Sequence, residues 1–299
     1  MSSEKHNSPL KIGIAGYGKM GQLRHEKVEV TGRAKVIGVC DPFTKPQGLA
    51  DGIHVYDDWN EMIASPDIDA LFVATVNALN KPITIAALQA GKHVFCEKPP
   101  AFTGADMMEI MAVERTSRCK LMYGFNHRQH GAAIHMRNIV DSGKYGRILW
   151  MRGRYGKSVD ADYLSTWRSD PSLAGGRILI DQGIHMLDLF LYLGGPFDEV
   201  QAMVSSLYWK IPGVEDNVFA LLRDSKTGRV ASIHSTMTQW RHIFSLEVFM
   251  ERGYMVLNGL KTSSDTYGKE VLVVATNRTT APAATWEEEE SFSYETDSS

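Results

Sequence analysis

Cysteine is scarce in this sequence. The 299 residues include three cysteines, Cys40, Cys96 and Cys119, and no two of them form a CxxC pair. An odd number at such spacing argues against a disulfide framework. We expect the thiols of Cys40 and Cys96 to be buried because both fall in apolar stretches. The cysteine usage therefore favours a reducing, cytoplasmic location.

Metal-binding motifs and long hydrophobic runs are missing as well. The ten histidines are scattered, without an HExxH motif or a Cys/His cluster, so we expect no metal site. No apolar run approaches the ~20 residues that a transmembrane helix needs. The first ten residues, MSSEKHNSPL, are polar, and we expect no signal peptide.

Positive charge is not in excess either. The formal net charge is -3, and no stripe of Lys and Arg of the kind that binds nucleic acid is visible. We therefore expect neither nucleic acid nor a membrane surface as a partner. The apolar fraction of 43% and the charged fraction of 22% are typical of a globular protein. The chain length favours two domains.

The first 124 residues alternate short apolar runs with amphipathic stretches. The expected strands are 11–16, 35–41, 70–75, 92–97 and 119–125, and the expected helices are about 19–31, 58–64, 80–91 and 103–117. Near-continuous apolar strands are typical of a sheet that is covered on both faces. The alternation predicts an α/β fold, a Rossmann-type doubly wound parallel sheet, in a domain spanning 1–124.

The pattern changes in the second half. We expect a helix at about 131–143, a buried helix at 178–195, and strands among the apolar runs 197–209, 217–224, 229–239, 243–251, 253–258 and 270–275. Consecutive strands with tight turns predict a mostly antiparallel sheet. Residues 125–299 are therefore expected to form an α+β domain with an open sheet. Helices on one face leave the other face to cover, which favours self-association of the chain.

A glycine-rich turn follows the first expected strand. In GIAGYGKMG, Gly16, Gly18 and Gly21 form G-x-G-x-x-G between that strand and a helix. The glycines permit a tight turn, let the backbone approach a pyrophosphate and let helix and strand pack, respectively. The helix N-terminus attracts the phosphates. Asp41 follows at the distance expected of a ribose-binding carboxylate, which favours NAD over NADP, although nearby Lys45 softens that preference.

A stripe of polar side chains runs along the expected buried helix. Asp181, His185 and Asp188 occupy positions i, i+4 and i+7, which places them on one face of an α-helix. A buried charge is costly unless it is paired. These residues therefore either pair with one another and with neighbouring loops, or line a cleft in which a proton is moved. The pattern alone leaves both possibilities open.

Several motifs, taken in order, resemble the Gfo/Idh/MocA family of oxidoreductases. They are GIAGYGKMG (13–21), CEKPPAFTGADMMEI (96–110), GFNHRQ (124–129), YGRI (145–148) and AGGRILIDQGIH (174–185). In that family, the lysine of the EKP motif and a D-x-x-x-H pair form the catalytic set. The resemblance therefore implies that Lys98, Asp181 and His185 are catalytic and that the stripe faces a nicotinamide.

The chemistry suits that assignment. Oxidising a secondary hydroxyl removes a hydride from carbon and a proton from oxygen, and histidine titrates near neutral pH. Our hypothesis is that His185 takes or returns the proton, that Lys98 stabilises charge on the same oxygen, and that Asp181 orients the substrate or His185. An exchange of roles within the Asp181 and His185 pair stays open. We interpret Asp188 as structural.

The resemblance also implies contacts to cofactor and substrate. The cofactor-binding set is Gly16, Tyr17, Gly18, Lys19, Met20, Gly21, Asp41, Thr75, Asn77, Glu97, Lys98 and Asn126. The substrate-binding set is Arg128, Tyr155, Trp167, Arg168, Asp181 and His185. The family pattern T-P-N-x-x-H is not fully kept, since Val76 and Asn80 replace its proline and histidine.

The function that the resemblance implies is an NAD(P)-dependent dehydrogenase or reductase acting on a secondary hydroxyl of a sugar, cyclitol or nucleotide sugar. Two alternatives are an NAD-dependent glycosidase of the same fold and a non-catalytic NAD-binding regulator. Regulators of this family typically lose the catalytic set, so its retention argues against the last. Family members continue for several dozen residues past SYETDSS, so we expect this chain to lack the usual C-terminal segment.

Overall fold

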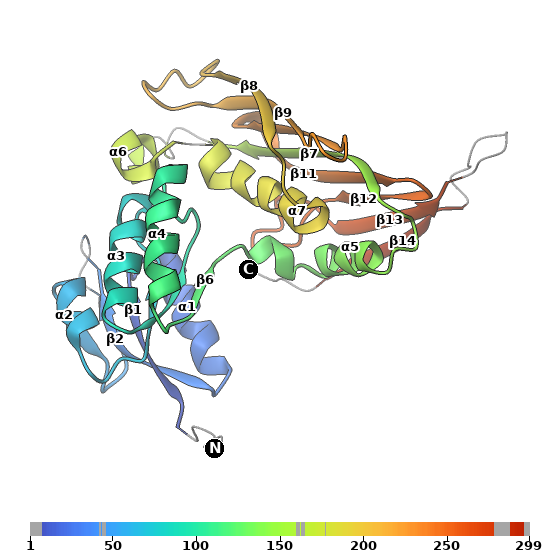
Figure 1. Ribbon diagram of the computed structural model, residues 1–299. Coiled ribbons are helices and arrows are strands. Elements are labelled where there is room, and N and C mark those ends of the chain that lie inside the picture. The colour runs from blue at the N-terminus through green and yellow to red at the C-terminus, as the bar shows by residue number, and fades with distance from the viewer. Residues whose placement is uncertain are drawn as a thin grey trace. The chain divides into compact units, whose positions relative to one another are not determined.

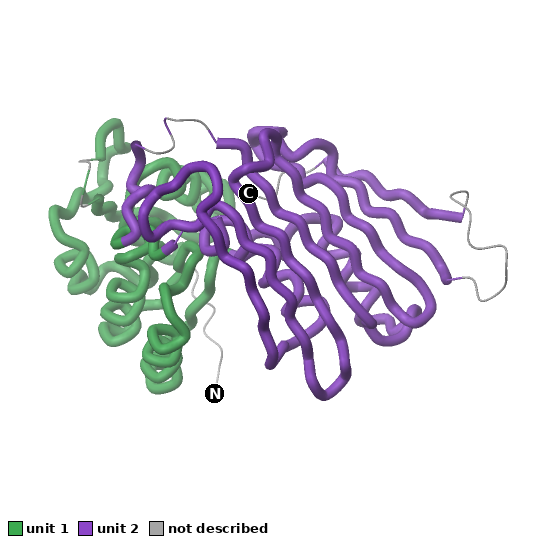
Figure 2. The backbone as a smooth tube through the Cα atoms, turned by 90° about the horizontal axis from the view of Figure 1, so that it is seen from above, with its two compact units in different colours: residues 1–124, 172–175 green, residues 125–171, 176–299 purple. Residues whose placement is uncertain are grey.

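The computed structural model describes residues 8–41, 43, 46–159, 162, 165–176, 178–277 and 288–295. The chain forms two compact units, which Figure 2 colours separately. The first comprises residues 1–124 and 172–175, and the second comprises residues 125–171 and 176–299. The short segment 172–175 therefore packs with the first unit, although its neighbours in sequence belong to the second.

The first unit is built on a parallel sheet of six described strands (Figure 1). They are β1 (Leu10–Ala15), β2 (Ala34–Cys40), β3 (His54–Tyr56), β4 (Ala70–Val73), β5 (His93–Cys96) and β6 (Leu121–Tyr123). Their spatial order is β3-β2-β1-β4-β5-β6. The order reverses beside β1, which is the point where sheets of this kind bind ligands. Strand β3 is absent from the expected strands because three residues are too few to show a pattern.

Helices cover both faces of this sheet. They are α1 (Lys19–Val30), α2 (Trp59–Ala64), α3 (Asn77–Gln89) and α4 (Gly104–Thr116). On β4, Leu71 and Val73 belong to one apolar cluster, whereas Ala70 and Phe72 contribute to another. Since successive side chains of a strand point to opposite faces, both faces are buried. The predicted doubly wound parallel sheet is confirmed.

The second unit is built on a sheet of eight described strands. They are β7 (Ile148–Ser158), β8 (Glu199–Ser205), β9 (Asn217–Arg223), β10 (Val230–Thr236), β11 (Thr238–Met250), β12 (Gly253–Asn258), β13 (Glu270–Thr276) and β14 (Glu290–Tyr294). Their order is β14-β13-β12-β11-β7-β10-β9-β8, and β7 with β10 is the parallel pair. The other neighbours are antiparallel, which confirms the predicted mostly antiparallel sheet.

One face of this sheet carries the helices α5 (Gly131–Asp141) and α7 (Ile184–Gly194) (Figure 1). Met186 and Phe190 of α7 join Met151 of β7 and Leu246 of β11 in the core. Other large apolar side chains of the sheet are exposed, among them Trp150, Val200, Met203, Phe219 and Leu221. The sheet is therefore open on its second face, as expected.

The expected buried helix at 178–195 consists of two different helical segments. Leu179–Gly183 form a π-helical turn, labelled η4, and α7 follows directly. The N–H of Ile184 donates to the carbonyl oxygen of Leu179, five residues back, which is the bond of a π-helix. The prediction of a buried helix is confirmed, but α-helical spacing does not hold through its first turn.

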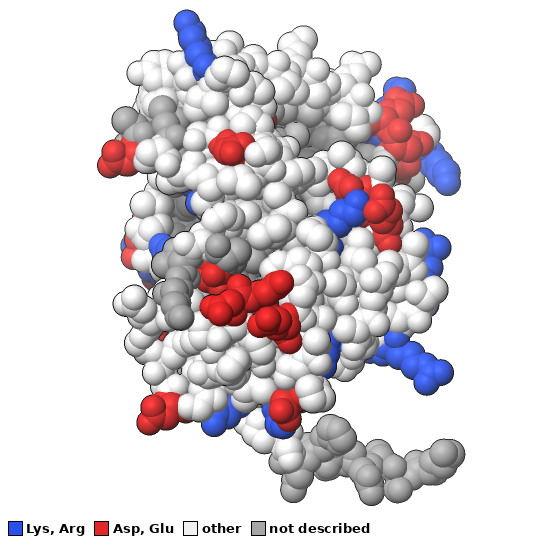
Figure 3. Space-filling model, turned by 90° about the vertical axis from the view of Figure 1, so that its left-hand side faces the viewer, with Lys and Arg blue, Asp and Glu red and all other residues white. Residues whose placement is uncertain are grey.

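Membrane-spanning helices, metal-ligand groups, basic side chains and cysteines can each be compared with the expectations from the sequence. Among the described residues, no helix is both long and apolar enough to cross a membrane. Within the same ranges, His, Cys, Asp and Glu side chains form no group of three that could hold a metal ion. Lys and Arg side chains are scattered over the face drawn in Figure 3. The cysteines are free thiols, and Cys40 and Cys96 are buried, as expected.

Candidate active site

The glycine-rich turn between β1 and α1 has a conformation that requires glycine. Gly16 has a φ of 87°, and a Cβ there would lie 2.4 Å from the carbonyl oxygen of Ala74. A Cβ on Gly21 would lie 2.0 Å from the carbonyl oxygen of Gly16. Neither position can hold a larger residue unless the backbone moves. Gly16 shapes the turn, and Gly21 lets α1 begin against it.

Gly18 has a different environment: beyond its neighbours in the chain, no atom of the residues that the structure describes lies within 4 Å of the Cβ it would carry. It caps α1 with its backbone and without a side-chain hydrogen bond. The first N–H groups of a helix have no earlier turn to bond to, and they attract anions. The open space at Gly18 therefore fits a phosphate group, and exposed Lys19 and Met20 follow it directly.

Asp41 directly follows β2 and is tied to the glycine turn. Its Oδ2 accepts a hydrogen bond from the Tyr17 N–H at 2.7 Å, and its Oδ1 accepts one from the Phe43 N–H at 2.9 Å. A carboxylate offers about four acceptor positions, which is the chemistry that binds the two hydroxyls of a ribose. Lys45 lies outside the described residues.

Lys98 lies in the turn after β5, and its two neighbours in sequence are held firmly. The fully buried amide of Asn80 donates to the carbonyl oxygens of Glu97 at 3.3 Å and of Pro99 at 2.8 Å. Arg24 of α1 donates to the Glu97 carboxylate at 2.7 Å. Asn80 and Arg24 thus fix the backbone on which half-buried Lys98 stands. The motifs alone reveal neither residue as a support.

Two further residues of the expected cofactor set lie at the start of α3. Thr75 donates to the Val76 carbonyl at 3.2 Å. Asn77 is 8% exposed, and its amide nitrogen donates to the carbonyl oxygen of Ala174 at 2.9 Å. That bond holds the segment 172–175 to the first unit. The amide oxygen of Asn77 is therefore the atom available for a cofactor contact.

In the second unit, His185 of α7 stacks on His127 of η1 (Asn126–Gln129). The ring centroids lie 3.9 Å apart, and the ring planes differ by 13°. Both side chains are buried. A stack of this kind disfavours two positive charges side by side.

His127 is bonded at both ring nitrogens. Its Nε2 lies 2.9 Å from the Tyr155 hydroxyl, and its Nδ1 lies 3.1 Å from Oδ1 of Asn126. Because Oδ1 of Asn126 accepts, the Nδ1–H of His127 donates to it. The Tyr155 hydroxyl can donate to Nε2 of His127 or accept from it. Burial raises the pKa of the Tyr155 phenol, so the hydroxyl keeps its proton.

Tyr155 therefore has a supporting role instead of the expected substrate contact, because it is 3% exposed and bonded to His127. Asn126 likewise bonds His127, although its side chain is only half-buried. His127 is the residue that motif reading misses. It stands between Asn126 and Arg128 in GFNHRQ, and only the fold brings it against His185.

Asp181 lies inside the π-turn, and its Oδ2 is 3.9 Å from Nε of Arg168. The Arg168 guanidinium lies over the ring of Trp167, 4.5 Å from its centroid. Both residues belong to the short 3₁₀ helix η3 (Trp167–Ser169), and both are half-buried. A carboxylate, a guanidinium and an aromatic face together provide the acceptors, donors and apolar surface that a polyhydroxylated ring needs.

Arg128 is committed to an ion pair. Its Nε and one terminal nitrogen bond the two carboxylate oxygens of Asp188, at 2.7 and 2.5 Å. Its guanidinium also lies over the Tyr192 ring. This bidentate pair explains how α7 carries a buried carboxylate. Asp188 is thus neutralised within the second unit, as a structural residue would be, and the Arg128 side chain that pairs with it is 40% exposed.

The three polar residues on the buried helix therefore differ in their surroundings. Asp188 is neutralised by Arg128, which realises the structural possibility. His185 packs against another ring, and Asp181 stands near a half-exposed arginine. The second possibility, a proton-transfer site, is open only for Asp181 and His185.

Comparison with known proteins relates both units to one family. Residues 10–125 match the family described as "Oxidoreductase family, NAD-binding Rossmann fold". Residues 134–256 match the "GFO/IDH/MocA C-terminal domain". A solved structure of levoglucosan dehydrogenase in complex with NADH and L-sorbose is similar with a TM-score of 0.80 and 27% identity, over 96% of this chain and 80% of that one.

Two curated relatives illustrate the similarity in sequence. Levoglucosan dehydrogenase of Pseudarthrobacter phenanthrenivorans is 38% identical over 151 residues, which is 50% of this chain and 39% of the relative. D-glucoside 3-dehydrogenase of Escherichia coli is 32% identical over 216 residues, which is 71% of this chain and 61% of the relative. The aligned part of this chain thus spans less than two thirds of either relative.

Proposed function

The chain belongs to the Gfo/Idh/MocA family of oxidoreductases, and from that premise we propose that it transfers a hydride between NAD and a secondary hydroxyl of a sugar, cyclitol or nucleotide sugar. Two relatives are named for levoglucosan and for D-glucosides. A glucoside or an anhydro sugar is therefore the first substrate to test. NADP is the less favoured cofactor because Asp41 would meet its 2′-phosphate.

The first unit fits the cofactor. Gly16 and Gly21 set the turn, Gly18 leaves space for the pyrophosphate, and Asp41 presents fixed acceptors for the ribose. Bound NAD+ would supply the hydride acceptor. The half-buried Lys98 stands on a backbone that Asn80 and Arg24 hold in place, so its ammonium is attached to a rigid turn.

The second unit fits the proton chemistry. In the oxidation, the hydroxyl O–H bond of the substrate breaks, its proton goes to His185, and the carbon loses a hydride to become a carbonyl. Lys98 donates a hydrogen bond to that oxygen as its negative charge develops. His127 packs against the His185 ring and keeps it in place. Asp181 with Arg168 and Trp167 orients the sugar hydroxyls.

The observation that carries this proposal is the buried stack of His185 on His127, in a chain that also keeps a complete glycine cradle. A protein that only senses NAD has no need of a proton acceptor. An enzyme that must take up one proton per turnover needs such a group.

The test is NADH formation by the purified chain with a panel of glucosides, anhydro sugars, polyols, sugar phosphates and nucleotide sugars. Lys98→Met removes the ammonium and keeps the length of the side chain, and Lys120→Met makes the same change at an exposed site of the same unit. We expect one substrate class to be oxidised, and kcat to fall about 10²–10³-fold in Lys98→Met alone.

Two other outcomes would contradict the proposal. Cleavage of a glycosidic bond without accumulation of NADH would identify the glycosidase. Tight NAD binding with no turnover of any substrate would identify the regulator. Equal activity of the Lys98→Met and Lys120→Met variants would remove Lys98 from the reaction.

The open face of the eight-stranded sheet favours a second copy of the chain as its partner. Trp150 and Phe249 stack there with centroids 4.2 Å apart, and Tyr254 continues the stack at 5.1 Å. Met203 and Phe219 are 79% and 51% exposed. Exposed apolar surface of this kind marks an interface. The proposal is therefore a homodimer or homotetramer. The free thiols fit a cytoplasmic location.

Sedimentation velocity tests the assembly. Met203→Glu with Phe219→Glu places two charges on the open face, and we expect this variant to sediment as a monomer while the wild type sediments as a dimer or tetramer. A matched change on the other unit, Val30→Glu, also replaces an exposed apolar side chain and should leave the assembly unchanged. A monomeric wild type would contradict the proposal.

A further inference from the structure

We propose that Gly183 and Ser235 are positioning residues for the catalytic pair, because their close packing holds the π-turn that sets Asp181 relative to His185. This inference rests on the proposed function for its activity measurements. Neither residue belongs to the site expected from the motifs. Each acts through the backbone of η4 instead of touching substrate or cofactor.

The π-turn stands where the geometry of the pair is decided. Asp181 lies within Leu179–Gly183, and His185 is the second residue of α7. π-helical turns are rare and concentrate at functional sites. An α-helical turn in the same place would rotate the preceding residues by about 100° per residue lost, because an α-helix has 3.6 residues per turn. The direction of Asp181 relative to His185 therefore depends on the extra residue.

Gly183 is buried at the end of the π-turn against β10. A Cβ on it would lie 2.9 Å from Oγ and 3.1 Å from Cβ of Ser235. Ser235 is itself fully buried in β10, between the paired strands β7 and β9. The backbone of Ser235 cannot retreat without disturbing both pairings. An added methyl group at 183 also meets Cδ1 of Leu179 at 2.9 Å. Leu179 Cδ1 and Ser235 Oγ can move with their side chains, whereas Cβ of Ser235 moves only with the strand, so the methyl group crowds the π-turn against the sheet.

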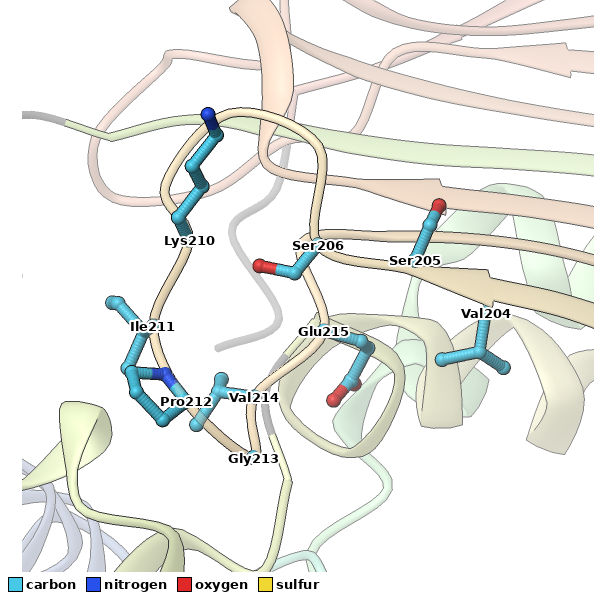
Figure 4. Close-up of a pocket in the computed structure, with 9 residues that line it drawn as sticks. All are labelled: Val204, Ser205, Ser206, Lys210, Ile211, Pro212, Gly213, Val214 and Glu215. Atoms are coloured by element: carbon cyan, nitrogen blue, oxygen red, sulfur yellow. The ribbon is translucent and has the colours of Figure 1, made fainter.

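The other end of the π-turn is held by the same serine and by a carboxylate. Ser235 Oγ donates to the carbonyl oxygen of Ile178 at 3.2 Å. Glu215, in the loop drawn in Figure 4, accepts a hydrogen bond from the Leu179 N–H at 3.0 Å. Ser235 thus contacts both ends of the π-turn, and Glu215 fixes its first N–H. Such bonding on both sides is what a rare backbone conformation needs in order to persist.

The test adds a methyl group on the helical side of the contact and removes a side chain of similar size on the strand side. Gly183→Ala adds a Cβ where Ser235 lies, and Ser235→Gly removes the atoms that it would meet. We expect Gly183→Ala to lower kcat about 10–100-fold, because small misplacements of catalytic groups are costly. The KM for NAD+ should stay within about threefold of the wild type, because the substitution leaves the residues proposed to bind NAD+ unchanged. The double variant should recover most of the lost kcat.

Ser235→Gly alone removes the hydroxyl bond to Ile178 and the packing against Gly183, so we expect it to lower kcat as well, but by less than Gly183→Ala. If Gly183→Ala does not fold, Ser235→Val crowds Gly183 from the side of the sheet with a residue that suits a strand. It should lower kcat, and circular dichroism of this variant should show that it is folded. Full kcat in Gly183→Ala, or a double variant no better than Gly183→Ala, would overturn the proposal.

A crystal structure separates this inference from the proposed function. The bond from Ile184 N–H to the Leu179 oxygen should be present in the wild type, lost in Gly183→Ala and restored in the double variant. If the wild type oxidises no substrate, the proposed function fails, and the three structures still decide the inference. An unchanged π-turn in Gly183→Ala would then overturn it.

Discussion

The two candidate sites in this chain differ in which atoms form them: backbone atoms in the first unit and side chains in the second. In the first unit, Gly16, Gly18 and Gly21 lie within six residues, and the cradle consists of backbone atoms and of the space that missing side chains leave. In the second unit, His127, Tyr155 and His185 lie far apart in sequence, and their side chains make the site. A backbone site restricts residue type locally. A side-chain site depends on packing between distant elements.

The comparison explains why the sequence alone predicts the glycine turn of the first unit well and the histidine site of the second unit only in part. A φ of 87° at Gly16 excludes nearly every other residue type. The conformation of this turn can therefore be predicted from the glycine in the sequence. His127, in contrast, has no local signature, because the same residue in another fold would be an ordinary core histidine. Substitutions in the two sites should therefore affect kcat, Tm and NAD affinity differently.

The largest expected effect comes from the stripe on the buried helix. His185→Asn removes the proton acceptor, and we expect kcat to fall about 10²–10⁴-fold with NAD affinity unchanged. Asp188→Asn breaks the ion pair with Arg128, and we expect Tm to fall while kcat is largely kept. Steady-state kinetics and thermal unfolding of both variants measure this. A loss of kcat in Asp188→Asn equal to that in His185→Asn would contradict the division of roles.

The glycine cradle comes next. Gly16→Ala forces a Cβ against Ala74 and a strained φ, which costs about 1–3 kcal/mol of stability and also disturbs the cofactor site. Gly18→Ala meets no atom of the described residues beyond its chain neighbours, so Tm should stay the same while NAD affinity falls at least about tenfold, or about 1.4 kcal/mol. Calorimetric titration with NAD+ and thermal unfolding separate the two. A Gly18→Ala variant with full affinity would show that no phosphate lies there.

A buried carboxylate in the second unit allows a pH-dependent test of how side-chain hydrogen bonds stabilise that unit. Glu270 accepts hydrogen bonds from His130 at 2.7 Å and from the N–H groups of Ala132 and Lys261 at 3.0 Å each. Burial alone would raise the pKa of the Glu270 carboxyl, but these hydrogen bonds bring that pKa below its ordinary value. The ionised form therefore stabilises the fold.

Because the pKa of Glu270 is lower in the folded than in the unfolded chain, its contribution is complete above the unfolded pKa and is lost as pH falls through the folded pKa. Glu270→Gln should cost about 1–3 kcal/mol of unfolding free energy at pH 7. The difference from the wild type should shrink in acid below about pH 4. Urea unfolding at both pH values measures it, with exposed Glu26→Gln as the control. A difference that does not change with pH would refute the linkage.

The smallest effect concerns the choice of cofactor. Asp41→Ala removes the ribose acceptor, and we expect NAD affinity to fall about tenfold while the ratio of NADP to NAD affinity rises. Asp51→Ala, at an exposed position of the same unit, is the matched control. Binding constants for both cofactors decide the matter. An unchanged ratio would remove Asp41 from the discrimination.

Much of the fold follows from the sequence, since apolar runs and turns specify both sheets. The parts that do not follow have physical reasons. Strand β3 is too short to show a pattern. The π-turn at Leu179–Gly183 is invisible to an analysis that assumes 3.6 residues per turn, and its cause, the contact of Gly183 with Ser235, is long-range. The pairing of Arg128 with Asp188 likewise depends on how η1 and α7 pack.

The most direct test of the account follows the hydride itself. The chain is incubated with NAD+ and a glucoside or anhydro sugar that carries deuterium on every carbon, and the reduced cofactor is analysed by mass spectrometry. The account predicts a reduced nicotinamide that contains one deuterium, together with an equal amount of a keto sugar. Bond cleavage without labelled cofactor, or binding of NAD without any reduction, would contradict it.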